Sequence, residues 1–169
     1  DPDLHIPEDH IHFPDPLNLD WISKRIEEVG GIDSCYGGIG YHGHVAFNEA
    51  VITRWYKVTP EAYRNSLTRL VHLAPETIVI NSIGASGGHP DALPPMAVTL
   101  GMRDIIASRR IRLYCPEGPW QRSVARIAMM AEPTTDYPVT LLQGHPDYRI
   151  IADQNTAAPP LPSDRMERI

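Results

Sequence analysis

The stretch GGIGYHGHVAFNE, residues 37–49, joins a glycine-rich turn to two histidines, an amide and a carboxylate. It follows directly on residues 32–36, an apolar run typical of a strand. Glycines have no Cβ, so the backbone can turn sharply there and approach a ligand closely. A glycine-rich turn alone is a weak signal, and the polar residues after it carry more information. We interpret residues 37–49 as a ligand-binding loop at the end of a strand.

The polar residues of this loop suit proton transfer. A histidine such as His44, with a carboxylate such as Glu49 to orient it and balance its charge, forms an acid/base pair near neutral pH. His42 and His44 can also be read as half of a metal site. No third or fourth ligand stands at suitable spacing, so we expect neither a metal nor another cofactor. From composition alone, a purely structural hydrogen-bonding role for both histidines stays open.

Outward from the loop, short apolar strands alternate with helical segments. A helix capped by Asn18 or Asp20 is expected to end at Gly30 and Gly31. Such alternation predicts an α/β fold of the three-layer, Rossmann-like kind with a mainly parallel sheet. Ligands of such sheets gather at the carboxyl ends of the strands, where the loop lies. The further expected elements are strands at 67–73, 96–100, 111–115 and 149–152, helices at 101–110 and from Pro119, a helical turn at 138–142, a strand or helical turn at 77–83, and a loop at 84–95.

The bulk properties limit the classes of partner. The chain has 169 residues and a formal net charge of -6, with no run of Lys and Arg. We therefore expect a single α/β domain portion over 1–169 that binds neither nucleic acid nor membrane, with an extended connection at 1–17 and a polar tail at 154–169. No apolar run is long enough to span a membrane. The two cysteines, Cys35 and Cys115, suggest small buried hydrophobes in a reducing cytoplasm.

The loop GGIGYHGHVAFNEA resembles the signature of the glucosamine-6-phosphate deaminase/isomerase family. Further segments resemble the family in the same order and extend the similarity over roughly residues 6–153. These segments are Ile6-Pro7-Glu8, Ser66-Leu67-Thr68-Arg69, Ala97-Val98-Thr99-Leu100-Gly101-Met102, Gln121-Arg122 and Leu142-Gln143-Gly144-His145-Pro146.

The resemblance implies roles for particular residues. His44 would be the acid/base that opens a sugar ring, with Glu49 as its carboxylate partner and His42 in the same relay. Gly38 and Gly40 would lie against the substrate. Two arginines would lie near a phosphate, because guanidinium groups match phosphate oxygens; these are Arg69 and Arg122.

The chain departs from the family pattern in three ways. His42 stands where the family has aspartate, and Ile83 stands where it has an arginine. The family's N-terminal half, with a phosphate loop and the aspartate that takes the C2 proton, has no counterpart here. The chain also lacks a starting methionine. We therefore expect the C-terminal portion of a divergent member, an incomplete half of the family domain.

Three functions follow as hypotheses. The first is a cytoplasmic enzyme that converts an amino-sugar phosphate to a ketose phosphate with release of ammonia, and that self-associates as its family members commonly do. The second is a sugar-phosphate-binding module without turnover, which the changes at His42 and Ile83 motivate. The third is a 6-phosphogluconolactonase-like hydrolase.

Overall fold

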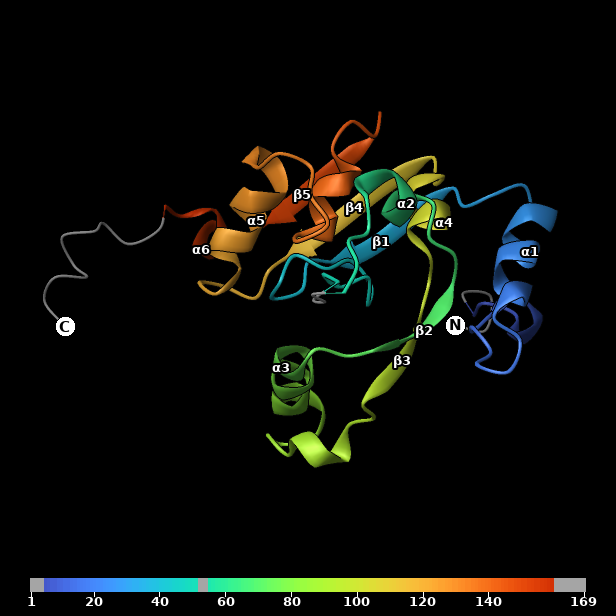
Figure 1. Ribbon diagram of the computed structural model, residues 1–169, viewed down its shortest axis with the longest axis horizontal. Helices are drawn as coiled ribbons and strands as arrows, with labels where there is room; N and C mark the ends of the chain where they lie inside the picture. The colour runs from blue at the N-terminus through green and yellow to red at the C-terminus, as the bar shows by residue number, and fades with distance from the viewer. Residues whose placement is uncertain (1–4, 52–54, 160–169) are drawn as a thin grey trace, which may run out of the picture.

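A parallel three-stranded sheet forms the centre of the fold. The computed structural model describes residues 5–51 and 55–159 (Figure 1). The strands β1 (Ser34–Gly38), β4 (Arg110–Cys115) and β5 (Tyr148–Ala152) lie in the order β1-β4-β5. The predicted parallel α/β sheet is confirmed. The first strand lies two residues later than expected, because the ladder continues into the glycine run, where Gly37 pairs with Leu113.

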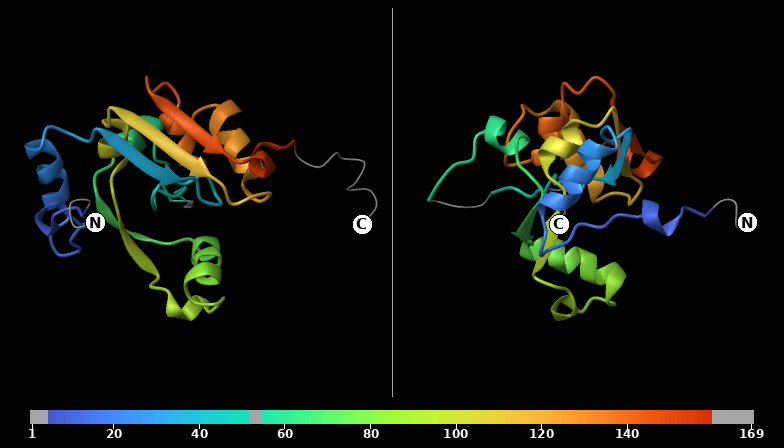
Figure 2. Two further views of the ribbon diagram at one scale, coloured as in Figure 1. Left: turned by 180° about the vertical axis from the view of Figure 1, so that it is seen from behind. Right: turned by 90° about the vertical axis from the view of Figure 1, so that its right-hand side faces the viewer.

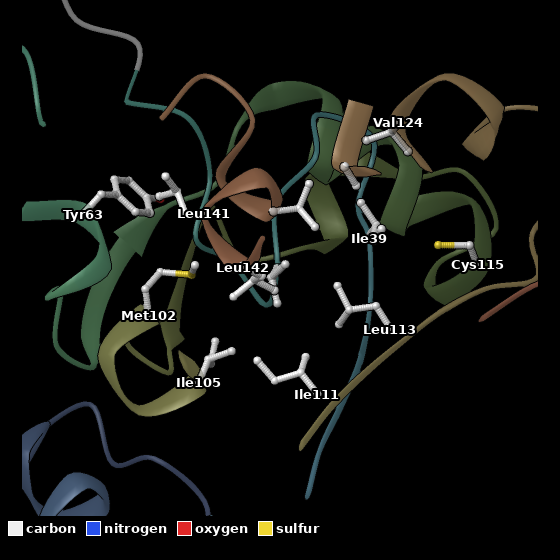
Figure 3. Close-up of a cluster of buried hydrophobic side chains, with 13 residues drawn as sticks. Ile39, Tyr63, Met102, Ile105, Ile111, Leu113, Cys115, Val124, Leu141 and Leu142 are labelled. Atoms are coloured by element: carbon white, nitrogen blue, oxygen red, sulfur yellow. The ribbon is translucent and has the colours of Figure 1, made fainter. Parts of the chain in front are cut away.

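Helices cover one face of this sheet and enclose the hydrophobic core. They are α2 (Pro60–Arg64), α4 (Met102–Ile106) and α5 (Gln121–Met130), with the 3-10 turn η4 (Pro138–Leu142) beside them. Alternate residues of β4 point into this core, and all three are completely buried: Ile111, Leu113 and Cys115 (Figure 3). Cys115 is thus the buried hydrophobe that was expected, whereas Cys35 is only half-buried.

The opposite face of the sheet is open. Tyr36, Arg112 and Tyr114 alternate with the core residues, and Tyr36 is 65% exposed. No helix lies over this face within the described residues, as Figure 2 shows from behind. Parallel sheets are ordinarily covered on both faces. Of the three layers that the sequence predicts, the described part of the chain therefore supplies two.

A second, antiparallel pair of strands extends from this body. β2 (Arg69–His72) pairs with β3 (Met96–Thr99), and between them the chain forms α3 (Pro75–Ala85) and η3 (Pro90–Ala92). The ambiguous run at 77–83 is thus a helix. Pro75 favours this outcome, since its fixed φ suits the first helical position and its missing N–H is not needed there.

The N-terminal helix differs from expectation at its start. α1 (Asp20–Glu28) has Leu19 at its N-cap, with no side-chain hydrogen bond to the helix, so the predicted cap by Asn18 or Asp20 is wrong. Asp20 is instead the first helical residue, where its charge complements the helix dipole. The predicted end is confirmed, because Gly30 has a φ of 86° just beyond the helix.

Two further boundaries are shifted. The predicted helix at 101–110 ends at Ile106, because Arg110 already belongs to β4. Part of the expected polar tail is helical: in α6 (Gln154–Ala157) the Asp153 carboxylate accepts the Thr156 N–H at 2.7 Å and caps the helix. Residues 160–169 of that tail and 1–4 of the expected connection lie outside the described residues. From residue 5, the connection contains the short turn η2 (Glu8–His10) and an isolated bridge from Asp15 to Asn18. Among the described residues, no helix has the length and apolarity that crossing a bilayer requires.

Candidate active site

A cavity of about 240 Å³ lies beside the carboxyl end of β1. The loop that follows β1, one side of α3 and the start of α5 form its walls. Its lining residues are Gly38, Ile39, Gly40, Tyr41, His44, Ala46, Phe47, Thr77, Ile80, Asn81, Tyr114, Glu117, Trp120 and Gln121. Both glycines that the sequence singled out are therefore at the cavity wall.

Gly40 makes the room that His44 occupies. A Cβ built on Gly40 would lie 1.9 Å from Nε2 and 2.2 Å from Cε1 of the His44 ring, which is far inside van der Waals contact. The Gly40 N–H also donates to the His44 carbonyl at 3.0 Å. Glycine at this position thus leaves room for the His44 ring and also for a ligand in the cavity.

His44 and Glu49 are brought together almost out of contact with solvent. The distance from His44 Nδ1 to Glu49 Oε1 is 3.8 Å, and the two side chains are 9% and 11% exposed. This distance exceeds that of a hydrogen bond, and Nδ1 has no hydrogen-bond partner among the described residues. Burial lowers the pKa of His44; the charge of His42 lowers it further, whereas Glu49 raises it. The imidazole is therefore neutral at neutral pH and able to accept a proton.

Glu49 is held by the beginning of α3. Its Oε2 accepts the Ala74 N–H at 2.7 Å, and its Oε1 accepts the Thr77 hydroxyl. Ala74 is the N-cap residue of α3 and has no side chain that could cap the helix; the negative charge of Glu49 beside it complements the helix dipole. The Tyr63 hydroxyl donates to the Glu49 backbone carbonyl. Thr77 was not predicted as a site residue, although its position three residues after Ala74, a helix start without a capping side chain, is a usable signal.

Two buried amides fix the loop to its surroundings. Asn48 Nδ2 donates to the carbonyls of Val45 and Leu100, at 3.1 and 2.8 Å, and so joins the loop to the end of β3. Gln121 Nε2 donates to the Ile39 carbonyl at 3.1 Å and joins the loop to α5. These hydrogen bonds connect segments that are far apart in the sequence, so local sequence patterns do not predict them.

The loop also contains one strained residue. Ala46 has a φ of 51°, a left-handed conformation that costs a residue with a Cβ about 1–2 kcal/mol. It lines the cavity between His44 and Phe47. Backbone strain of this kind is concentrated at functional sites.

The other predicted residues lie away from the cavity wall. The Arg69 guanidinium donates to the Leu67 carbonyl and lies 5.7 Å from the centroid of the Tyr63 ring. Arg122 donates to the Asn155 carbonyl at 2.7 Å and supports α6. His42 is next to the lining residue Tyr41 but does not itself line the cavity. Within residues 5–51 and 55–159, the wall of this cavity contains no lysine or arginine, and the predicted roles of Arg69 and Arg122 near a phosphate stay predictions.

Comparison with known proteins supports the family resemblance of the loop. No protein-family model matches it. A glucosamine-6-phosphate deaminase from Staphylococcus epidermidis is 32% identical over 159 residues, covering 90% of this chain and 60% of the relative. A second, from Halothermothrix orenii, is 34% identical and covers 87% and 58%.

Solved structures add the fold. A monomeric glucosamine-6-phosphate deaminase superposes with a TM-score of 0.68 at 26% identity, covering 82% of this chain and 54% of that one. A 6-phosphogluconolactonase from Trypanosoma cruzi reaches 0.54 at 18% identity, which shows a shared fold only. The chain spans about 60% of the length of the curated relatives it matches. Over nearly all of its own length, the chain is a homologue of the glucosamine-6-phosphate deaminases.

Proposed function

We propose that this chain is part of an enzyme that opens the ring of an amino-sugar phosphate, isomerises it to a ketose phosphate and releases ammonia. The observation that carries the proposal is the buried pair of His44 and Glu49 at the cavity beside β1. Its support from relatives is the name glucosamine-6-phosphate deaminase, which those proteins bear.

We assign the two residues of the pair complementary roles in ring opening. His44 Nδ1 faces Glu49, so Nε2 is the nitrogen available to a ligand. A neutral imidazole takes the proton of the O1 hydroxyl and returns a proton to the ring oxygen as the C1–O5 bond breaks. The imidazolium formed between these steps lies beside the Glu49 carboxylate, which stabilises its charge in a site of low exposure.

The cavity wall supports a sugar ring as the ligand. The rings of Tyr41 and Trp120 both line the cavity, with centroids 6.1 Å apart. Aromatic faces offer apolar area at a small cost in conformational entropy, and sugar rings present a C–H face that packs on them. Glu117, in the same wall, offers a carboxylate to a hydroxyl or ammonium group.

The proposed reaction needs two further groups. One is the base that moves the proton from C2 to C1, and the other is the cation that binds the phosphate. We infer that both belong to the part of the relatives' length that this chain does not match. We place the enzyme in the cytoplasm as a self-associating protein, in keeping with the sequence-based expectation.

A sugar-phosphate-binding module is the second candidate. His42 in place of an acid motivates it, as does Ile83, which is 68% exposed on α3 where the family signature has an arginine. The lactonase hypothesis has only the shared fold in its favour.

Release of ammonia from glucosamine 6-phosphate by the full-length protein tests the proposal. We expect ammonia and ketose phosphate in equal amounts, and a loss of about 100-fold or more in kcat for His44→Gln. His89→Gln, at an exposed position in the turn before η3, is the matched control and should keep full activity. Binding without either product would establish the binding module instead, and hydrolysis of 6-phosphogluconolactone would establish the hydrolase. Glucosamine without phosphate measures the contribution of the phosphate site.

A further inference from the structure

The two hydrogen bonds that orient the Glu49 carboxylate both come from α3. The Ala74 N–H binds Oε2, and the Thr77 hydroxyl binds Oε1. Thr77 is 2% exposed, so its hydroxyl is largely shielded from bulk solvent. The carboxylate is thus fixed by the start of the helix that also forms one wall of the cavity.

One oxygen of this carboxylate serves two neighbours. Glu49 Oε1 accepts the Thr77 hydroxyl and is also the oxygen closest to His44 Nδ1, at 3.8 Å. A carboxylate oxygen can accept two hydrogen bonds, but each bond draws on the same negative charge. In the structure Oε1 is bound by Thr77 and lies beyond hydrogen-bond distance of His44 Nδ1.

We propose that Thr77 is a positioning residue, whose hydroxyl fixes Glu49 and limits how strongly this carboxylate binds the His44 imidazolium. The inference rests on the proposed role of the His44–Glu49 pair. It adds the residue that sets the strength of that pair. A weaker interaction between Glu49 and the His44 imidazolium keeps His44 neutral down to a lower pH. It also makes the protonated imidazole a better acid toward the ring oxygen.

Other groups near His44 define what the test must separate. Glu49 and His42 are the charges that act on its imidazole, and Glu117, Tyr41 and Tyr114 line the same cavity. Thr77 contributes no charge of its own. A change at Thr77 can therefore reach His44 through Glu49 or through altered hydration, and these two routes have to be distinguished.

Titration of the His44 Cε1–H resonance by NMR makes this distinction and needs no substrate. Thr77→Val removes the hydroxyl and keeps the shape of the side chain. It should raise the midpoint of His44 by about 0.5–1 pH unit, because Glu49 becomes free to bind the imidazolium. Thr77→Ser keeps the hydroxyl and should leave the midpoint unchanged. Thr156→Val removes another buried threonine hydroxyl, far along the chain in α6, and should have no effect.

The same substitution in a Glu49→Gln background completes a double-mutant cycle. If Thr77 acts through the carboxylate, Thr77→Val causes no further shift there. A shift of equal size in both backgrounds would mean that water entry is responsible and would overturn the proposal. An unchanged midpoint in folded Thr77→Val would overturn it as well. Thr77→Ala provides the same measurement if the valine variant does not fold. The titration needs no enzyme activity, so its result can be interpreted even if the protein releases no ammonia. Likewise, a failure of the Thr77 proposal would not contradict the proposed enzyme activity.

Discussion

Replacing Gly40 by alanine tests the site at its closest contact. The new methyl group would lie 1.9 Å from His44 Nε2 and 2.4 Å from Cδ2, so the ring and the methyl group cannot both keep their places. His44 borders the cavity, so its ring can move into that space at the cost of its present packing. We expect the free energy of unfolding to fall by about 1–3 kcal/mol, the usual cost of overpacking.

The displaced ring should also become easier to protonate. Burial is the main reason that the pKa of His44 is low, so movement into the open cavity raises the midpoint toward its ordinary value. Chemical denaturation and NMR titration of Gly40→Ala measure the two effects separately. Ligand binding by the full-length variant should fall with them, because the imidazole then occupies the place of the sugar.

Gly37→Ala is the matched control for this experiment. Its Cβ would meet Leu113 Cδ2 at 3.4 Å, an ordinary contact, and a strand residue with a side chain is favoured over glycine by about 0.5 kcal/mol. The control should therefore fold at least as stably as the parent chain and keep the midpoint of His44. If Gly40→Ala behaves like Gly37→Ala in both measurements, His44 does not occupy the space beside Gly40, and the site described above is incorrect.

Three further substitutions have defined outcomes. Ala46→Gly relieves a φ of 51° and should raise the free energy of unfolding by about 0.5–1 kcal/mol in urea denaturation. Burial raises the pKa of Tyr63 to about 12, so the folded state keeps this proton longer than the unfolded state does. The free energy of unfolding should therefore be unaffected by the ionisation of Tyr63 below about pH 10 and should fall by roughly 2–3 kcal/mol from pH 10 to 12. Urea denaturation across this range should show a smaller fall for Tyr63→Phe. His42→Asp replaces a repelling charge by an attracting one and should raise the NMR titration midpoint of His44 by about 0.5–1 pH unit. His42→Asn only removes the repelling charge and should raise the midpoint by less. Equal midpoints would show that residue 42 does not act on the imidazole.

The sequence predicted the parts of this fold that local patterns encode. Apolar runs between turn residues gave β4 and β5 nearly to the residue, and Gly30 and Gly31 gave the end of α1. The pairing of β2 with β3 in a separate antiparallel arm was not predictable in this way. Strand partners are selected by long-range packing, and both runs alternate like any half-buried strand.

In the candidate site, too, local contacts could be predicted from the sequence and long-range contacts could not. His44 and Glu49 stand five residues apart in one loop, and their proximity could be read from the sequence. Thr77 and Gln121 come from distant segments, so only folding brings them to that loop. The family resemblance places Arg69 near a phosphate, and this role stays a prediction. In the structure its guanidinium lies over the Tyr63 ring.

We expect the histidine at position 42 to alter the acid/base balance of the proposed site without removing its capacity for proton transfer. An aspartate there, as in the family signature, would attract a proton to His44, whereas His42 acts in the opposite direction. A less basic imidazole takes the O1 proton less readily but returns it to the ring oxygen more readily, and ring opening needs both transfers. Glu49 remains to stabilise the imidazolium, and its two bonds to the start of α3 keep it in place. A binding module would have no need for a carboxylate held at 11% exposure beside an imidazole without a hydrogen bond at Nδ1. The cost of burying that pair supports the proposed enzyme over the binding module, and we expect the pH optimum of the enzyme to be lower than that of its His42→Asp variant.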